Sequence, residues 1–261
     1  MIGVFDSGLG GLSVLAAIAH ELPSADLAYL ADSAHVPYGT KPDEFIRKRV
    51  LAIGSHLAER GCGMIVVACN TATAAAVQAL RDQHPGIPVV GVEPGVKPAA
   101  ASSRTRHIAV LTTESTARSA GLNRLIRTHA SQVTVQVEAC PGWATRIETL
   151  HLADTGFAAE VAAKVEPLID GGADRLVLGC THYTFLLPLL ETLVAGRAEL
   201  VDVAAAVARQ VVRLAGGHAH GCGRLTLLAT AHPERLHKAL PALGLTRLVP
   251  RISGAALQVQ I

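Results

Sequence analysis

The sequence has few aromatic residues, few charges and no long apolar run. Aromatic side chains make up 3% of its 261 residues, which leaves few platforms on which single-stranded bases could stack. The 23 basic and 21 acidic side chains leave a formal net charge of +2, so the totals carry no electrostatic surplus for nucleic acid. No run approaches the ~18 apolar residues that a membrane helix needs. We therefore expect no nucleic-acid partner and no membrane association.

Half of the residues are hydrophobic, which excludes an intrinsically disordered chain. The length corresponds to one large domain or two compact ones. Residues 1–6 lack the basic region that opens a signal peptide, and they reach a carboxylate at Asp6. We expect a cytoplasmic protein.

The cysteines form no recognised framework. Their number is odd and no C-x-x-C pair occurs, which argues against a disulfide scaffold, a zinc ribbon and thioredoxin-type chemistry. A His-x-His-x-Cys run ends at Cys222 but lies between glycines with no fourth ligand nearby, so we expect no metal site. Cys62 and Cys140 are expected to be packing residues, which leaves Cys69 and Cys180 to be explained.

Short β-rich runs alternate with helical stretches along the chain. Buried strands are predicted at residues 2–5, 27–30, 64–68, 88–92, 108–111, 133–137 and 175–178. Helices are predicted over residues 44–60, 71–80, 115–128 and 157–169, the second with Thr71 or Thr73 as its N-cap. This alternation predicts βαβ units, mainly parallel sheets and helices on both faces of each sheet.

Two breaks and one internal echo predict two domains. Residues 91–106 contain two prolines and two serines, and residues 216–223 are rich in glycine. Residues 65–71 resemble residues 175–182, because each is a β-rich run that reaches a small residue, then Cys, then a polar residue and a helical pattern. Two similar half-sites on two similar domains explain this echo most simply.

Cys69 and Cys180 both fall where a predicted parallel strand ends and a helix begins. Ligands of open α/β sheets bind at this edge, where helix N-termini present free N–H groups. We expect the helix dipole to favour the thiolate and to lower the pKa of each thiol. A single free cysteine is more often a small buried hydrophobe, but a matched pair with polar neighbours favours a functional reading.

The neighbours of these cysteines suit a charged ligand. Asn70, Thr71, Thr181 and His182 offer donors for a carboxylate. Asp6 could bind an ammonium group or orient a thiol together with Ser7, although it could also be a simple helix N-cap.

Two glycine-containing loops accompany these residues. Residues 8–11 are Gly-Leu-Gly-Gly, without the third Gly of a dinucleotide fingerprint and without the Lys of a P-loop. We expect a tight turn that lets a small ligand approach the backbone. Residues 37–40 form a loop that either makes an ordinary turn or faces a substrate.

Two thiols that face one ligand suit acid–base chemistry better than nucleophilic catalysis, which uses one Cys with a His base. One thiolate can remove a proton from a carbon while the opposite thiol returns a proton to the other face. Inversion of a stereocentre needs this arrangement.

Several motifs stand together, in order and at matching spacing, and the chain resembles bacterial glutamate racemases over about residues 2–210. The motifs are Gly-Val-Phe-Asp-Ser-Gly-Leu-Gly-Gly-Leu at 3–12, Ala-Asp-Ser at 31–33, Val-Pro-Tyr-Gly-Thr-Lys at 36–41, Val-Ala-Cys-Asn-Thr-Ala at 67–72, Glu-Pro-Gly at 93–95 and Leu-Gly-Cys-Thr-His-Tyr at 178–183.

The resemblance implies an α/β protein of two pseudo-symmetric three-layer domains with mainly parallel sheets and an active site at their interface. We expect residues 1–97 and about 204–223 in the first domain, and residues 98–203 and about 224–261 in the second. It also implies a homodimer that interconverts L- and D-glutamate without a cofactor and supplies D-glutamate for peptidoglycan.

Site residues carry over by position. Cys69 is then the thiol that deprotonates D-glutamate and Cys180 the one that deprotonates L-glutamate, with Asp6, His182 and Glu148 assisting. The implied substrate-binding residues are Asp6, Ser7, Tyr38, Gly39, Asn70, Thr71, Thr113, Thr116, Thr181 and His182.

The chain departs from the family pattern at Thr184, where Pro is usual, and at residues 142–146, where a more apolar stretch is usual. Three other functions remain open on the sequence: a racemase of aspartate or another acidic amino acid, an amino-acid-binding regulatory protein, and a single-cysteine hydrolase.

Overall fold

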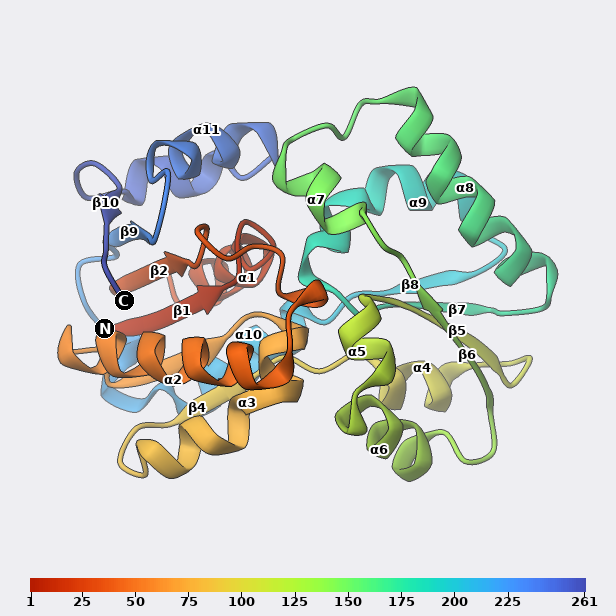
Figure 1. Cartoon of the computed structure of the whole chain (residues 1–261), viewed down its shortest axis with the longest axis horizontal. Coiled ribbons are helices and arrows are strands. Elements are labelled where there is room, and N and C mark those ends of the chain that lie inside the picture. Colours follow the sequence, from red (N-terminus) through yellow and green to blue (C-terminus); the bar gives the residue numbers. More distant parts are fainter.

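Two parallel β-sheets lie side by side and organise the molecule (Figure 1). The computed structural model describes all 261 residues. The first sheet has the order β10-β9-β2-β1-β3-β4, with strands β1 (Ile2–Asp6), β2 (Leu27–Ala31), β3 (Met64–Val67), β4 (Val89–Gly91), β9 (Leu225–Ala229) and β10 (Leu257–Gln258). The second has the order β6-β5-β7-β8, with β5 (His107–Thr112), β6 (Thr134–Ala139), β7 (Arg175–Leu178) and β8 (Glu199–Val201). All pairings are parallel, so the predicted α/β class with two parallel sheets is confirmed.

Helices cover both faces of the first sheet, and we call this assembly the first unit. Its helices are α1 (Leu12–Glu21), α2 (Asp43–Glu59), α3 (Asn70–Gln83), α10 (Ala204–Ala215) and α11 (Glu234–Ala242). Successive strand residues point to opposite faces: Val4 packs in one buried cluster with α1, α10 and α11, whereas Phe5 packs in another with α2 and α3. Burial on both faces explains why β1 is apolar until Asp6.

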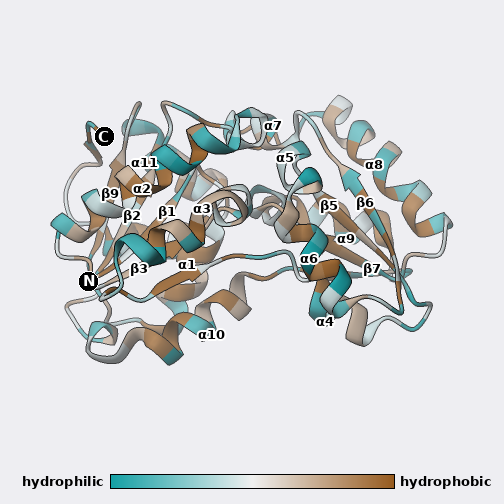
Figure 2. Cartoon of the chain, turned by 60° about the horizontal axis from the view of Figure 1, so that its bottom comes forward, coloured by the Kyte–Doolittle hydropathy of each residue, from teal (hydrophilic) through white to brown (hydrophobic).

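The second unit is built in the same way around the second sheet. Its helices are α4 (Val96–Ser102), α5 (Glu114–Arg118), α6 (Ala120–His129), α7 (Trp143–Glu148), α8 (Thr155–Asp170) and α9 (Leu187–Val194). Leu176 of β7 packs in the cluster that contains α8 and α9, and Val177 in the one that contains α4 and α6. Figure 2 shows apolar brown strands covered by helices such as α6 and α8, in which teal and brown bands alternate.

The last segment of the chain belongs to the first unit, so its predicted place in the second domain is wrong. Strand β9 pairs with β2 along its whole length, from Leu27 opposite Leu225 to Ala31 opposite Ala229. Leu228 is fully buried against the first sheet's α2–α3 side. Residues 224–261 thus extend the first sheet by two strands, because β2 otherwise leaves an apolar edge unpaired.

Two predicted elements differ in detail. The helix predicted over residues 115–128 is interrupted at Ser119, which ends α5 and caps α6 by accepting a hydrogen bond from the Leu122 amide. The break predicted at residues 91–106 is where the chain crosses between the sheets, but it also contains α4. Pro98 lies in the first turn of α4, where no intrahelical amide bond is lost.

Short 3₁₀ helices complete the chain at η1 (Tyr38–Thr40), η2 (Thr181–Leu186), η3 (Gly216–Ala219) and η4 (Thr246–Arg251). No helix combines the length and the apolar character that crossing a membrane requires.

The position of β9 makes a testable prediction about stability. Truncating the fully buried Leu228 with Leu228→Ala should lower the free energy of unfolding by about 2–5 kcal/mol, through lost burial and the cavity left behind. Leu257→Ala on β10, where the residue is 47% exposed, should change it by about 0.5 kcal/mol or less. Urea unfolding of the two variants and the wild type measures both values, and equal effects would contradict the observed place of β9.

Candidate active site

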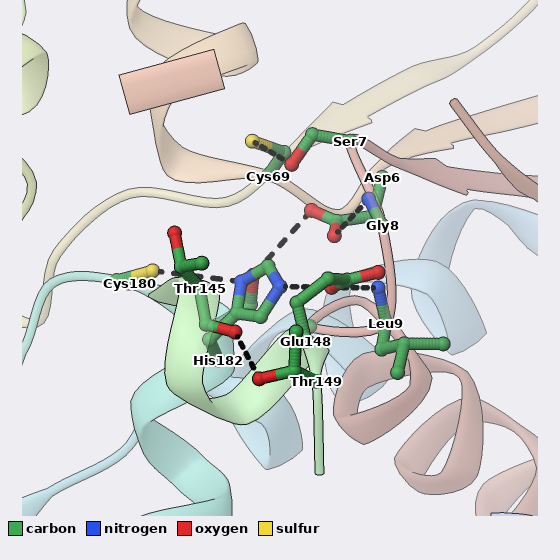
Figure 3. Close-up of polar contacts among 12 residues, drawn as sticks. Asp6, Ser7, Gly8, Leu9, Cys69, Thr145, Glu148, Thr149, Cys180 and His182 are labelled. Carbon is green, nitrogen blue, oxygen red and sulfur yellow. Dashed lines mark hydrogen bonds and ion pairs between the residues drawn. The ribbon is translucent and has the colours of Figure 1, made fainter. Parts of the chain in front are cut away.

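The site lies where four strands from the two units end. Asp6 ends β1 and Ser7 follows it, and Cys69 follows β3, whereas Thr113 follows β5 and Cys180 follows β7. The carboxyl ends of parallel strands share one edge of a sheet, and here the two edges face each other. Figure 3 shows both thiols with the polar groups that surround them.

Cys69 is itself the N-cap of α3. Its Sγ accepts a hydrogen bond from the Ala72 amide at 3.5 Å, and its thiol faces the Ser7 hydroxyl at 4.0 Å. The predicted caps, Thr71 and Thr73, are therefore wrong. Thr73 instead donates to the Val67 carbonyl.

The pKa of the Cys69 thiol is raised well above its ordinary value, contrary to the sequence-based expectation. Burial is the main cause, and the neighbouring Asp6 carboxyl and the Cys180 sulfur raise the pKa further. The helix amide of Ala72 lowers it, but by less. Because removal from water disfavours the charged form, Cys69 is held as a neutral thiol.

Cys180 has a different environment. It lies at the end of β7 and precedes η2, with its sulfur 3.8 Å from Nδ1 of His182. Nε2 of the same imidazole lies 2.8 Å from Oε2 of Glu148. A carboxylate thus orients the ring that faces the thiol.

The pKa of His182 is raised well above its ordinary value. Burial alone would lower it, but the hydrogen bonds with Cys180 and Glu148 and the charge of Asp6 outweigh burial. The resulting imidazolium lies beside the Cys180 sulfur, whereas Cys69 has the Asp6 carboxyl as its charged neighbour. The two thiols are therefore not equivalent.

Glu148 links the second unit to the backbone of the first. Its Oε2 also accepts a hydrogen bond from the Leu9 amide at 2.9 Å. Glu148 is the last residue of α7. Two hydrogen bonds stabilise this helix end: the Thr149 hydroxyl donates to the Thr145 carbonyl, and the Arg235 guanidinium donates to the Glu148 carbonyl. Neither Arg235 nor the Leu9 amide was expected from the sequence, since one is an exposed arginine and the other a backbone group.

Helix α7 is anchored despite the unusual sequence of residues 142–146. Gly142 adopts a left-handed conformation (φ 82°) at its N-cap, which glycine tolerates without strain. Trp143 is buried and packs edge-on against Tyr183 at 5.3 Å and Phe157 at 6.3 Å. The Trp143 side chain supplies the apolar anchor that positions Glu148.

The glycines of residues 8–11 leave space for side chains of the second unit. A Cβ on Gly8 would lie 2.4 Å from Oε2 of Glu148, and a Cβ on Gly10 would lie 2.4 Å from Nδ1 of His182. The close approach predicted for a small ligand is made instead by two side chains of the second unit. Tyr29 supports this turn, because its hydroxyl donates to the Gly8 carbonyl at 2.6 Å.

Asp6 is completely buried at the same turn. Its Oδ2 accepts from the Gly8 amide at 3.0 Å, and its Oδ1 faces the Thr181 hydroxyl of the second unit at 3.5 Å. Burial raises the pKa of Asp6, although the charge of His182 and the Gly8 amide lower it. Asp6 thus contacts residues of both units.

Three predicted substrate-binding threonines form a triangle of hydroxyls across the units. Thr71 lies 3.1 Å from Thr113 and 3.2 Å from Thr116, and these two are 3.1 Å apart. The neighbouring Asn70 side chain is buried, and neither polar atom of its amide has a partner in the chain. An unpartnered buried amide is costly, so the site has unused donor and acceptor capacity here.

Tyr38 and Gly39 lie on η1 beside this triangle. A Cβ on Gly39 would lie 2.9 Å from Cβ of Thr113. The Tyr38 phenol is buried and donates to Asp32. The structure therefore brings every predicted site residue into one connected region between the units.

The raised pKa of His182 predicts how stability changes with pH. A group with a raised folded pKa stabilises the fold fully below its unfolded pKa, near 6.5, and loses that effect as pH rises through the folded pKa. Glu148→Gln should lower the His182 pKa and cost about 1.5–3 kcal/mol at acidic pH, with the cost shrinking above pH 6.5.

Urea unfolding between about pH 5.5 and 9 tests this prediction. Glu166→Gln, at an exposed position of α8, is the matched control and should show little effect at any pH. A cost of Glu148→Gln that stays constant over this range would show that His182 does not titrate as inferred.

Known proteins resemble this chain over most of its length. Residues 2–211 match the Asp/Glu/hydantoin racemase family. A glutamate racemase of Ectopseudomonas mendocina is 45% identical over 262 residues, covering 100% of this chain and 97% of that protein. A glutamate racemase isoform of Bacillus anthracis superposes with a TM-score of 0.87 at 28% identity, covering 100% and 97% of the two chains. Escherichia coli glutamate racemase, solved with L-glutamate and the activator UDP-MurNAc-Ala, gives 0.84 at 31% identity, covering 93% and 94%. The chain belongs to the Asp/Glu/hydantoin racemase family.

Proposed function

We propose that this chain is a glutamate racemase that interconverts L- and D-glutamate by proton transfer at Cα between two thiols. The observation that carries the proposal is the pair Cys69 and Cys180, one at a strand end of each unit, with opposite electrostatic surroundings. The glutamate racemases with which the chain aligns support the choice of substrate.

The proton transfers balance without a further reagent. For L-glutamate, the Cys180 thiolate removes the Cα proton and becomes a thiol, and the Cys69 thiol donates its proton to the opposite face of the carbanion and becomes a thiolate. D-glutamate reacts by the reverse transfers. The raised pKa of Cys69 supports its role as the proton donor when L-glutamate reacts.

The α-hydrogen of an amino acid is far less acidic than a thiol, so the site must stabilise the developing carbanion. Donors aimed at the substrate carboxylate do this best where water is excluded. The unpartnered Asn70 amide, the N-terminus of α3 and the threonine triangle are suited to that role. Asp6, which is buried near Cys69 and faces the Thr181 hydroxyl, is placed to contact the substrate ammonium.

The alternatives account for less of the site. A racemase of aspartate or another acidic amino acid would use the same thiols, and one methylene alters binding in a simple pocket by only about 1–3 kcal/mol. A regulatory binding protein would not need two thiols at matching strand ends. A single-cysteine hydrolase would leave the other half-site without a role.

The family resemblance supports three further parts of the proposal. The protein acts in the cytoplasm as a homodimer, and its product D-glutamate enters peptidoglycan. We assign no cofactor to the reaction, because the two thiols can perform both proton transfers.

Turnover in D2O tests the proposed reaction. Purified protein incubated with L-glutamate in D2O, without added cofactor, should abolish the optical rotation and place deuterium at Cα, because the proton returned to the carbanion comes from an exchangeable thiol. Polarimetry and NMR follow the two changes together. Faster turnover of L-aspartate in parallel would favour the other acidic substrate, and inertness toward both would favour a binding protein.

Replacement of either thiol tests the mechanism. Cys69→Ala and Cys180→Ala should each reduce racemisation by at least about 10³-fold, because one acid–base partner is lost in both directions. Cys222→Ala removes an exposed thiol and should leave turnover unchanged. Circular dichroism should show all three variants folded, and near-normal turnover by either site variant would rule out the two-thiol mechanism.

A further inference from the structure

Asp32, which follows β2, accepts four hydrogen bonds through its carboxylate, although the proposed reaction gives it no role. Its side chain is fully buried. Its carboxylate accepts from the Tyr38 phenol, from Nε and Nη2 of Arg49 at 2.9 Å each, and from the Thr230 hydroxyl at 2.8 Å. These donors come from η1, from α2 and from the segment after β9.

Arg49 is the only charged partner among these donors. Its side chain projects from α2 and is 12% exposed. The guanidinium donates two parallel hydrogen bonds to the Asp32 carboxylate. Its remaining Nη1 donates to the Ile261 carbonyl at 2.6 Å. The planar guanidinium is suited to this bidentate geometry, which a lysine ammonium cannot reproduce.

A buried ion pair of this kind contributes little net stability, because desolvation of both charges offsets their attraction. Its geometric effect is clearer, since two parallel bonds fix the carboxylate plane. The Asp32 amide also donates to the Asp6 carbonyl at 3.0 Å. Asp32 therefore lies beside the end of β1 that carries Asp6.

The hydrogen bond from the Tyr38 phenol to Asp32 connects the ion pair to η1. Burial raises the pKa of Tyr38, and the Asp32 charge raises it further, so the phenol remains a donor to Asp32. Because the phenol proton is committed there, Tyr38 can donate a hydrogen bond to a substrate only through its backbone amide. The amides of Tyr38 and Gly39 open η1 and donate to no acceptor within the chain.

We propose that Arg49 is a positioning residue for the substrate site: it fixes Asp32, which through Tyr38 holds η1 where the Tyr38 and Gly39 amides meet a substrate carboxylate. The proposal rests on the proposed function. η1 packs closely on the second unit, because a Cβ added to Gly39 would lie only 2.9 Å from Cβ of Thr113.

The test compares the kinetics of Arg49→Met, Arg49→Lys and the wild type. Arg49→Met should raise KM for L-glutamate about tenfold, equivalent to one substrate hydrogen bond, and should change kcat by less than about threefold, because neither thiol is touched. Arg49→Lys should give an intermediate KM, because it keeps the positive charge but cannot make two parallel hydrogen bonds to Asp32. Lys48→Met removes the adjacent exposed cation of α2 and should leave both constants unchanged.

The outcomes separate this inference from the proposed function. No turnover by the wild type would overturn the proposed function and, with it, the proposed role of Arg49. An active wild type together with an unchanged KM in folded Arg49→Met, or a loss confined to kcat, would overturn the positioning role alone.

Folding of the variants is measured by circular dichroism. If Arg49→Met does not fold, because Asp32 is left as an uncompensated buried charge, the double variant Asp32→Asn/Arg49→Met replaces it and should show the same raised KM. If neither folds, Arg49→Lys decides, since it keeps the charge. A wild-type KM in the deciding variant would overturn the proposal.

Discussion

The carboxylate of Glu148 receives hydrogen bonds from both units at once. One comes from the Leu9 amide of the first unit and the other from His182 of the second. Both contacts require the backbone at Gly8 and Gly10 to carry no Cβ. Since the same oxygen accepts from the Leu9 amide and faces the imidazole, this contact between the units and the charge of His182 are coupled. A shift of α7 would loosen both.

This coupling makes the two half-sites chemically unequal although the strands that carry them are alike. Cys69 lies near a buried carboxyl group, and burial keeps it as a neutral thiol. Cys180 lies beside an imidazole that its neighbours keep protonated. In the proposed reaction one sulfur must hold a proton while the other lacks one. The two sulfurs have different charged neighbours in the structure, a carboxyl group beside Cys69 and an imidazole beside Cys180.

The local pattern of apolar and polar residues predicts most strands and helices and the positions of the two site cysteines. Strand β7 was predicted at its observed bounds, and α2 lies within one residue of the predicted 44–60, because side-chain periodicity is a property of neighbouring residues. Cys69 and Cys180 were singled out because each follows a buried strand and precedes a helical turn. The place of residues 224–261 was wrong, since an apolar strand carries no signal of which sheet edge it will pair with.

The sequence by itself determined the alternation of strands and helices, the two strand-end cysteines and the motifs that identify the family. Tertiary structure decided which groups meet: Thr230 reaches Asp32 across 198 positions, and Leu9 reaches Glu148 across 139. It also decided the direction of the Cys69 pKa. A helix N-terminus can be recognised in a sequence, but the desolvation that outweighs it depends on how completely distant segments exclude water from the sulfur.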